Sequence, residues 1–199
     1  MKKQNTIHPN HPPKARNFAV SLLLVALAAL PPAHAASLTW DSNGPTAPPM
    51  LNGSGTWNTS TANWWNGAAN VTWNNTTPDS AAFGSGTNTS AWVTANVVTL
   101  GTGITVGNLL FTNWNSGSSG TTNMQYQITG NTLTLAGTPT ITTRSDGLIT
   151  STLVGTGFTK DGAGILRVDG TSTAYTGAAT ISAGTLQIGN NGGGGRRDG

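Results

Sequence analysis

The sequence predicts an all-β fold in which short strands stack as the coils of a solenoid. Between Gly157 and Gly189, short segments alternate apolar and polar residues, the pattern of strands with one buried face. Glycine turns separate these segments so closely that a free-standing sheet could not form, whereas stacked coils would bury the apolar faces. Helix is disfavoured beyond the N-terminal segment, because glutamate is absent and Gly or Pro interrupts every long window.

Residues 1–35 are predicted to be a secretory signal peptide. Four basic residues precede an apolar run at residues 18–30, and the Ala-His-Ala at residues 33–35 places small residues where a signal peptidase cleaves. The run is too short for a comfortable membrane span. An uncleaved anchor or a buried helix is the alternative, but the charge order and the cleavage motif favour cleavage after Ala35. We expect export by the bacterial secretion machinery and no stable membrane span in the mature chain.

Residues 36–92 are predicted to form an N-terminal cap. They are rich in Trp and Asn, and Trp-Asn pairs recur at eight-residue intervals, at residues 57–58, 65–66 and 73–74. A solenoid needs a distinct terminal unit to shield its first coil, and large aromatic side chains suit that role. Exposed rings could instead stack on sugars, with the neighbouring Asn supplying hydrogen bonds. The candidate glycan-contacting residues are therefore Trp57, Trp65 and Trp73.

Residues 93–189 are predicted to form the solenoid. Four segments share an alternating pattern, and their leucines lie 24, 33 and 20 residues apart, in the range of solenoid repeats. The leucines expected to point inward are Leu109, Leu133, Leu166 and Leu186. The last coil ends without a capping unit, so the chain taken alone is expected to be marginally stable. Residues 190–199 are expected to be a flexible Gly-rich tail.

The final coils resemble a known exported repeat. The resemblance is carried by residues 158–164 (FTKDGAG), 175–177 (YTG) and 181–189 (ISAGTLQIG). This ordered run is similar to the autotransporter-associated β-strand repeat, also called the passenger-associated transport repeat, over residues 157–189. Segments near the N-terminus, such as residues 79–84, resemble the start of such passengers. The resemblance implies a right-handed parallel β-helix that a C-terminal outer-membrane barrel exports to the cell surface.

The C-terminal residues depart from the pattern of that family. Autotransporters end in a barrel of alternating strands of roughly ten residues, and residues 195–199 (GRRDG) follow the last repeat without such strands. We therefore expect an N-terminal passenger fragment, with a truncated reading frame or a secreted piece as the alternatives. The expected location is the cell surface or the extracellular space, or the periplasm if no barrel follows.

The residues of the mature chain argue against catalysis. All three histidines lie in the predicted leader, and cysteine and glutamate are absent, which excludes Ser-His-Asp and Cys-His arrangements and His- or Cys-based zinc sites. Asp146, Asp161 and Asp169 are the nearest approach to a glycosidase-type or lyase-type carboxylate pair. The Asp-Gly dipeptides at residues 161–162 and 169–170 favour turns instead. We therefore expect no catalytic residue, metal or cofactor.

Charge also limits the function classes. Four of the nine Lys and Arg residues lie in the leader and all six Asp lie beyond it, so the mature chain carries no basic excess. Nucleic-acid binding, which needs a clustered basic surface, is not expected. The leading hypothesis is a non-enzymatic exported passenger segment that acts as a stalk or scaffold. The alternatives are a carbohydrate- or surface-binding adhesin module at residues 40–92 and, last, a polysaccharide-active β-helix enzyme.

Overall fold

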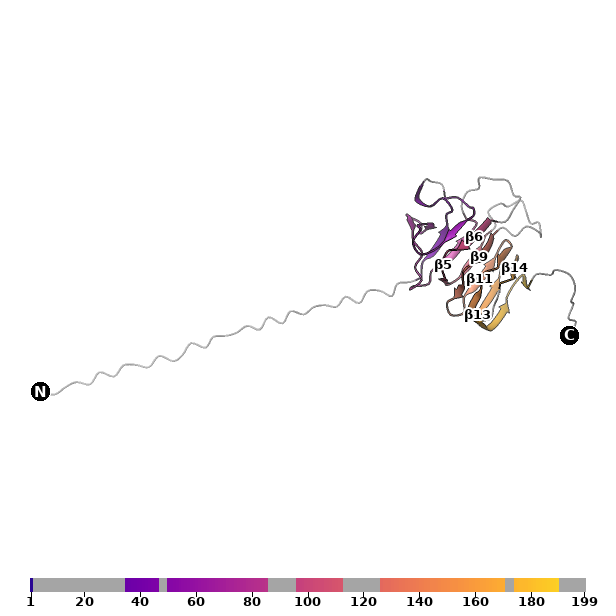
Figure 1. Cartoon of the computed structure of the whole chain (residues 1–199). Helices are drawn as coiled ribbons and strands as arrows, with labels where there is room; N and C mark the ends of the chain where they lie inside the picture. The colour runs from indigo at the N-terminus through magenta and orange to yellow at the C-terminus, as the bar shows by residue number, and fades with distance from the viewer. Residues whose placement is uncertain (2–34, 47–49, 86–95, 113–125, 171–173, 190–199) are drawn as a thin grey trace. The chain divides into compact units, whose positions relative to one another are not determined.

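The computed structural model of the chain describes Met1 and residues 35–46, 50–85, 96–112, 126–170 and 174–189 (Figure 1). The chain divides into two parts, Met1–Pro32 and Ala33–Gly199, and every described element lies in the second part. Residues 2–34 of the predicted signal peptide and the predicted tail at residues 190–199 lie outside the described residues.

The described part of the chain is all-β, as predicted. Its one helical element is a 3-10 turn, η1 (Gly44–Thr46), and it contains no helix long and apolar enough to cross a membrane. The strands are β1 (Ser37–Trp40), β2 (Gly55–Trp57), β3 (Trp64–Trp65), β4 (Asn70–Val71), β5 (Ser80–Phe83), β6 (Asn96–Leu100), β7 (Ile104–Val106), β8 (Leu109–Phe111), β9 (Tyr126–Gly130), β10 (Leu133–Leu135), β11 (Thr140–Thr143), β12 (Gly147–Ile149), β13 (Leu153–Asp161), β14 (Ile165–Val168), β15 (Ala174–Ile181) and β16 (Thr185–Ile188).

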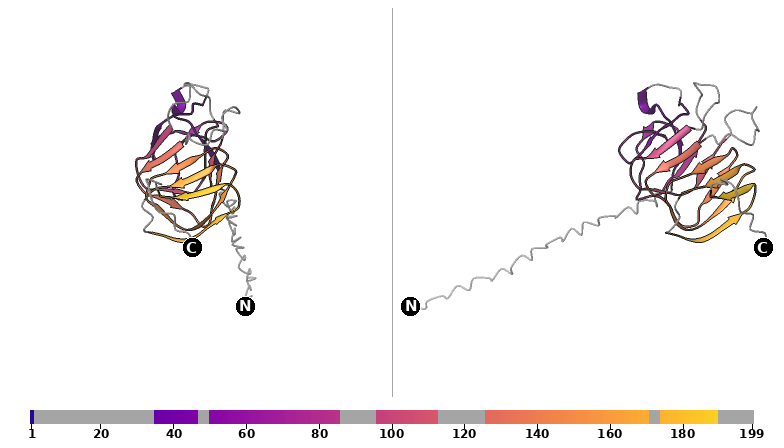
Figure 2. Two further views of the ribbon diagram at one scale, coloured as in Figure 1. Left: turned by 90° about the vertical axis from the view of Figure 1, so that its right-hand side faces the viewer. Right: turned by 45° about the vertical axis from the view of Figure 1, so that its right-hand side comes forward.

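These strands form two sheets whose pairing is almost entirely parallel. The ten-stranded sheet runs β4-β3-β1-β5-β8-β11-β13-β10-β7, with β15 also paired to β13, and the six-stranded sheet runs β16-β14-β12-β9-β6-β2. Only the β1–β3 and β3–β4 pairs are antiparallel. Neighbours in a parallel sheet cannot be joined by a tight hairpin. The chain instead forms other strands between the two that pair. We call each such circuit of the chain a pass, and successive passes lie side by side (Figure 2).

The pairing register repeats along the chain. Strands β9, β10 and β11 pair with β6, β7 and β8, respectively, and the next pass of the chain continues this order through β12 and β13. The nine-residue β13 serves two positions, because its start pairs with β10 and its end pairs with β11. Aligned residues lie 19–21 positions apart in the C-terminal passes, as in Ile141 with Lys160, Leu166 with Leu186, and Tyr126 with Gly147.

The four predicted leucines face inward but do not form a single repeat. Leu109, Leu133 and Leu166 are at most 1% exposed, and Leu186 is partly buried against the core. They lie, however, at three different pairing positions, and only Leu166 and Leu186 are aligned partners. The predicted intervals of 24 and 33 residues therefore compared strands that are not equivalent. Alternation looks the same on every strand of a pass, so it reports the buried face and not the register.

The N-terminal region joins the same sheets. Strand β5 pairs in parallel with both β1 and β8, and β2 pairs in parallel with β6. Only β3 and β4 turn back on β1 as an antiparallel extension. The boundary predicted at residue 92 falls within residues 86–95, which lie outside the described residues, and parallel pairing continues on either side of it.

Candidate functional site

An aromatic cluster fills the interior next to β1, β2 and β3. Trp40, Trp57, Trp64, Trp73 and Phe83 are each at most 2% exposed. Ring centroids lie 4.8 Å apart for Trp57 and Trp64, and 4.7 Å apart for Trp57 and Trp73, in tilted and edge-on geometries that aromatic pairs prefer. The indole N–H of Trp73 donates to the carbonyl of Thr105 at 3.0 Å, which ties the cluster to β7. This cluster buries the largest side chains of the described chain.

The cluster corrects the predicted glycan surface. Trp57 and Trp73 are 0% and 2% exposed, so their rings cannot lie against a sugar, whereas Trp65 is half-buried. The two tryptophans of β3 face opposite ways because successive side chains of a strand alternate. Trp64 therefore enters the cluster and Trp65 lies on the other face of the strand. The eight-residue recurrence pointed to Trp65 and missed the buried Trp64.

The asparagines of the three Trp-Asn pairs form turns. Each side-chain oxygen accepts backbone N–H groups two or three residues ahead, which is the Asx-turn geometry. These bonds run to Asn58 from Ser60 (2.9 Å) and Thr61 (2.7 Å), to Asn66 from Ala68 and Ala69 (both 2.9 Å), and to Asn74 from Thr76 (2.9 Å). The oxygens expected to bind a sugar thus hold the loops after β2, after β3 and before β5.

Tyr126 extends the aromatic cluster into β9. The side chain is fully buried, with its ring centroid 5.3 Å from that of Phe83. Its hydroxyl donates to Asn52 Oδ1 at 3.3 Å and accepts the Gly53 N–H at 3.2 Å. Burial raises the pKa of Tyr126 above its usual range, so the phenol stays neutral at physiological pH. Tyr126 therefore ties the loop before β2 to β9.

The opposite end of the sheets has open edges, formed by β15 and β16. Among the described strands, β16 pairs only with β14 and β15 only with β13. Ile181 and Ile188 are 54% and 68% exposed, and they align with the buried Lys160 and Val168 of the preceding pass. Unpaired backbone beside exposed apolar side chains is a template for another strand. We call β15 and β16 the open edge.

Lys160 lies buried beside this open edge. The side chain is 0% exposed, and its Nζ donates to the carbonyls of Asp161 (2.9 Å), Gly162 (2.8 Å) and Ala183 (2.9 Å). Desolvation lowers the pKa of Lys160, partly opposed by the charges of Asp161 and Asp146. The carbonyls of Asp161 and Gly162 follow Lys160 directly in the chain, at the end of β13 and the start of the next turn, and the Ala183 carbonyl belongs to the turn between β15 and β16. The ammonium group thus joins two successive turns.

Glycines let these turns approach closely. Gly162 and Gly184 have φ angles of +79° and +71°, which favour glycine. A Cβ atom at Gly162 would overlap the Thr143 carbonyl, and one at Gly184 would overlap the Gly162 carbonyl and lie 2.8 Å from Lys160 Nζ. In the sequence, Lys160 was included in the repeat motif at residues 158–164 but was assigned no structural role. Its inward position in the alternating run at residues 158–160, with no other lysine after residue 35, was the available signal.

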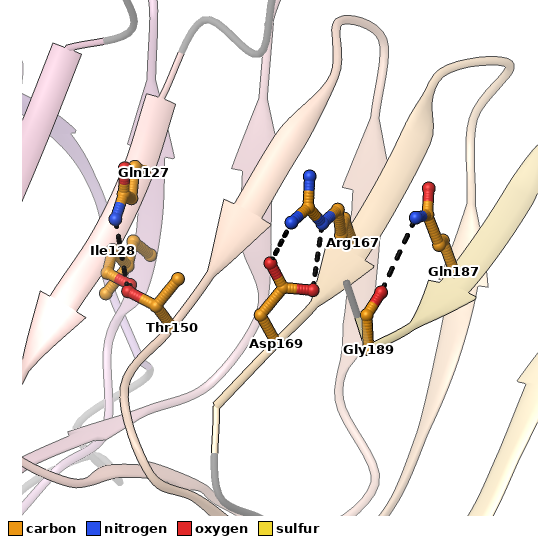
Figure 3. Close-up of polar contacts among 7 residues, drawn as sticks. All are labelled: Gln127, Ile128, Thr150, Arg167, Asp169, Gln187 and Gly189. Atoms are coloured by element: carbon orange, nitrogen blue, oxygen red, sulfur yellow. Dashed lines mark hydrogen bonds and ion pairs between the residues drawn. The ribbon is translucent and has the colours of Figure 1, made fainter. Parts of the chain in front are cut away.

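The predicted carboxylates are held by different partners. Asp169 forms an ion pair with Arg167, with Nε and Oδ1 2.8 Å apart (Figure 3). Asp146 accepts the Ile165 N–H at 2.8 Å. Asp161 precedes the turn at Gly162. In the ranges that the structure describes, no group of three or more His, Cys, Asp or Glu residues could hold a metal.

Polar side chains mark the outer face of the six-stranded sheet. Gln127, Arg167 and Gln187 come from β9, β14 and β16 (Figure 3). Gln127 contacts a residue that follows the neighbouring strand β12, whereas Arg167 and Gln187 contact residues that follow their own strands. Gln127 donates to Thr150 Oγ1 at 3.2 Å, and Gln187 donates to the Gly189 carbonyl at 3.4 Å. These contacts use part of the hydrogen-bonding capacity of this face.

Residues 158–188 match the family described as passenger-associated-transport-repeat. The chain carries this repeat. The predicted passenger-associated repeat is thereby confirmed over residues 158–188, and the match contains the lysine and both glycines of the stacked turns. The match begins within β13 and ends with β16, so the passenger-associated repeat covers the open edge and the strands that support it.

The chain is also similar to a much longer protein. It is 40% identical over 190 residues to the "Adhesin BmaC autotransporter" of Brucella suis biovar 1 (strain 1330), a match that covers 87% of this chain. The match covers 5% of that relative, so the chain corresponds to a small fraction of its length. No solved structure matches the chain. The repeat and this similarity together bear out the expected autotransporter passenger repeat.

Proposed function

We propose that the chain is a non-enzymatic segment of an exported autotransporter passenger and that it folds as a right-handed parallel β-helix serving as a stalk or scaffold. The observation that carries this proposal is the parallel register, in which aligned residues recur every 19–21 positions across residues 126–188. A segment whose successive passes share one register extends by repetition and needs no catalytic centre. The passenger-associated repeat and the relative named as an autotransporter support the same conclusion.

The open edge suits further stacking. Ile181, Leu186 and Ile188 align with Lys160, Leu166 and Val168, which are at most 5% exposed. A following coil would therefore bury these three side chains as the preceding coils bury theirs. Burying an Ile or Leu side chain contributes about 1.5–3 kcal/mol of transfer free energy, much of it offset by the ordering of the added backbone. We infer that the open edge receives the next coil of a longer passenger.

The location of the mature segment follows from its proposed export. We propose that residues 1–35 are removed after Ala35 by a signal peptidase during passage through the bacterial secretion machinery. The mature segment would then lie at the cell surface or outside the cell. The relative's printed description as an autotransporter supports this location.

The stacking role predicts that an added coil stabilises the chain. A second copy of residues 170–189, inserted after Gly189, continues the 20-residue spacing between Leu166 and Leu186. We expect the midpoint of thermal unfolding to rise by about 2–4 °C for each kcal/mol of net stacking free energy. A matched insert with serine at its copies of Leu186 and Ile188 should give no rise. Equal midpoints for the parent and both extended chains would contradict the proposal, as would parent unfolding above about 90 °C.

An adhesin module is the second candidate function, because the relative's name includes that activity. Trp65 is the one of the three predicted glycan-contacting tryptophans whose ring reaches solvent. An aromatic contact with a sugar would contribute about 0.5–1.5 kcal/mol. Weak glycan binding by the mature protein that is lost on Trp65→Ala, with folding intact, would favour this function over a purely structural role.

A further inference from the structure

The N-terminal end of β1 is held by a long-range contact. The backbone N–H of Ala36 donates to Asp79 Oδ1 at 2.7 Å, and the Ser80 N–H donates to the Ala36 carbonyl at 2.8 Å. These two bonds join residue 36 to Asp79, 43 positions further along the chain, and to Ser80, the first residue of β5. They extend the parallel β1–β5 pairing by one residue, since Ser37 is aligned with Ser80. The backbone nitrogen of Ala36 is thus placed against a carboxylate oxygen.

Cleavage after Ala35 would change the chemistry of that nitrogen. Hydrolysis adds one water across the Ala35–Ala36 peptide bond, leaving a carboxylate on Ala35 and an ammonium group on Ala36. A free α-amino group has a pKa of about 7.7–8.0 and is mostly protonated at neutral pH. The distance of 2.7 Å already suits a charge-assisted N–H···O bond. The contact would therefore become an ion pair without any movement of the backbone.

We propose that Asp79 is the acceptor of the mature α-ammonium group, so that removal of the signal peptide creates an ion pair that fastens β1 to β5. This inference rests on the proposed cleavage after Ala35. Ala35 and Ala36 are exposed, which leaves the bond open to a peptidase, whereas Asp79 is half-buried. Asp79 is itself held in place, because its carbonyl accepts the Gly107 N–H at 2.8 Å.

Asp79 has no cationic side chain as a partner in the described residues. The ion pair that the described residues contain joins Arg167 and Asp169 instead. The carboxylate of Asp79 meets a neutral amide while the leader is attached and a positive charge once the leader is removed. Its partner strand β1 carries Leu38 and Trp40, which are 2% and 0% exposed in the core. The ion pair thus secures a strand that contributes directly to the aromatic cluster.

A consequence follows for the order of export and folding. The precursor lacks the α-ammonium group at residue 36, so its folded state lacks this stabilisation. The folded state gains the ion pair only after the leader has been cleaved. Folding of the N-terminal end is therefore favoured on the far side of the inner membrane, after processing.

The test is a double-mutant cycle that varies the charge of the N-terminal amino group and the carboxylate of residue 79. Chains beginning at Ala36 are prepared with a free or an Nα-acetylated terminus, in the parent, Asp79→Asn and Asp146→Asn backgrounds. Asp146 is the matched control, because it accepts a backbone N–H at 2.8 Å far from residue 36 in the sequence. Acetylation should lower the unfolding midpoint by about 2–4 °C in the parent and in Asp146→Asn, and by less than about 1 °C in Asp79→Asn. The same loss in all three backgrounds would overturn the proposal.

Two further measurements keep the outcome decisive. A chain beginning at Ala35 moves the charge one residue away, so it should lose the same 2–4 °C or so without any change to Asp79. No loss in this chain would also overturn the proposal, even if Asp79→Asn did not fold. Raising NaCl to about 1 M should shrink every such difference, because the Debye length falls to about 3 Å. N-terminal sequencing of exported protein tests the cleavage separately, and a start other than Ala36 would remove its premise.

Discussion

Replacement of Trp64 by alanine should lower the midpoint of thermal unfolding by about 6–20 °C. Trp64 is 0% exposed, and its ring centroid lies 4.8 Å from those of Trp57 and Trp73 and 5.3 Å from that of Trp40. Truncating a buried Trp to Ala typically costs about 3–5 kcal/mol, because apolar burial is lost and a cavity remains. In a domain of this size each kcal/mol shifts the midpoint by about 2–4 °C.

Trp65→Ala is the matched control, since the two residues are neighbours in the same two-residue strand. Trp65 is half-buried, so its truncation should cost about 1 kcal/mol or less, within the range of surface substitutions and partial burial. Calorimetry or circular dichroism of both variants measures the difference. Equal losses for the two variants would mean that the aromatic cluster does not hold the N-terminal end of the sheets together.

Replacement of Lys160 by methionine should destabilise the chain by about 2–4 kcal/mol. Methionine keeps most of the buried stem but removes the ammonium group that binds three carbonyls at 2.8–2.9 Å. Hydrogen bonds to a charged group contribute about 1.5–3 kcal/mol each, and an unsatisfied buried acceptor costs about 1–3 kcal/mol. Part of this loss is offset because the buried ammonium no longer has to be desolvated.

The location of the effect distinguishes this role from general packing. Loss of the Lys160 bond to Ala183 should release the turn between β15 and β16, so hydrogen exchange should accelerate there before it does in β9 or β12. Arg167→Met is the control, because it removes a partly exposed cation and its ion pair with Asp169 and should cost about 1 kcal/mol or less. Denaturant unfolding of Lys160→Met within about 0.5 kcal/mol of the parent would contradict this role of Lys160.

The sequence predicted the strand class and the buried faces, because alternation reports directly which side of a strand faces the core. The inward positions of Leu109, Leu133 and Leu166 illustrate this success. The register was missed, because all strands of a pass carry the same alternation and only pairing tells them apart. The repeat at residues 157–189 was found through its resemblance to a known motif, and the close approach of successive turns explains the glycines at residues 162 and 184 of that motif.

The candidate sites were harder to predict, because they depend on long-range placement. Trp64 and Trp65 are adjacent residues of the same type, and only the orientation of β3 separates a buried ring from a half-buried one. The contact between Ala36 and Asp79 joins residues 43 positions apart, which no local pattern can indicate. Lys160 could have been singled out, since an isolated lysine at an inward position must find partners for its ammonium group.

The central claim, that successive passes stack in parallel register, is tested most directly by cross-linking. The chain contains no cysteine, so pairs can be introduced without background. Leu148→Cys with Arg167→Cys places two thiols on aligned residues of neighbouring strands, which lie about 4.8 Å apart. Leu148→Cys with Gln187→Cys places them two strands apart, because Gln187 aligns with Arg167. A bifunctional thiol reagent spanning about one strand spacing should join the first pair rapidly and leave the second unjoined. Equal cross-linking of both pairs, or of the second alone, would contradict the parallel stack.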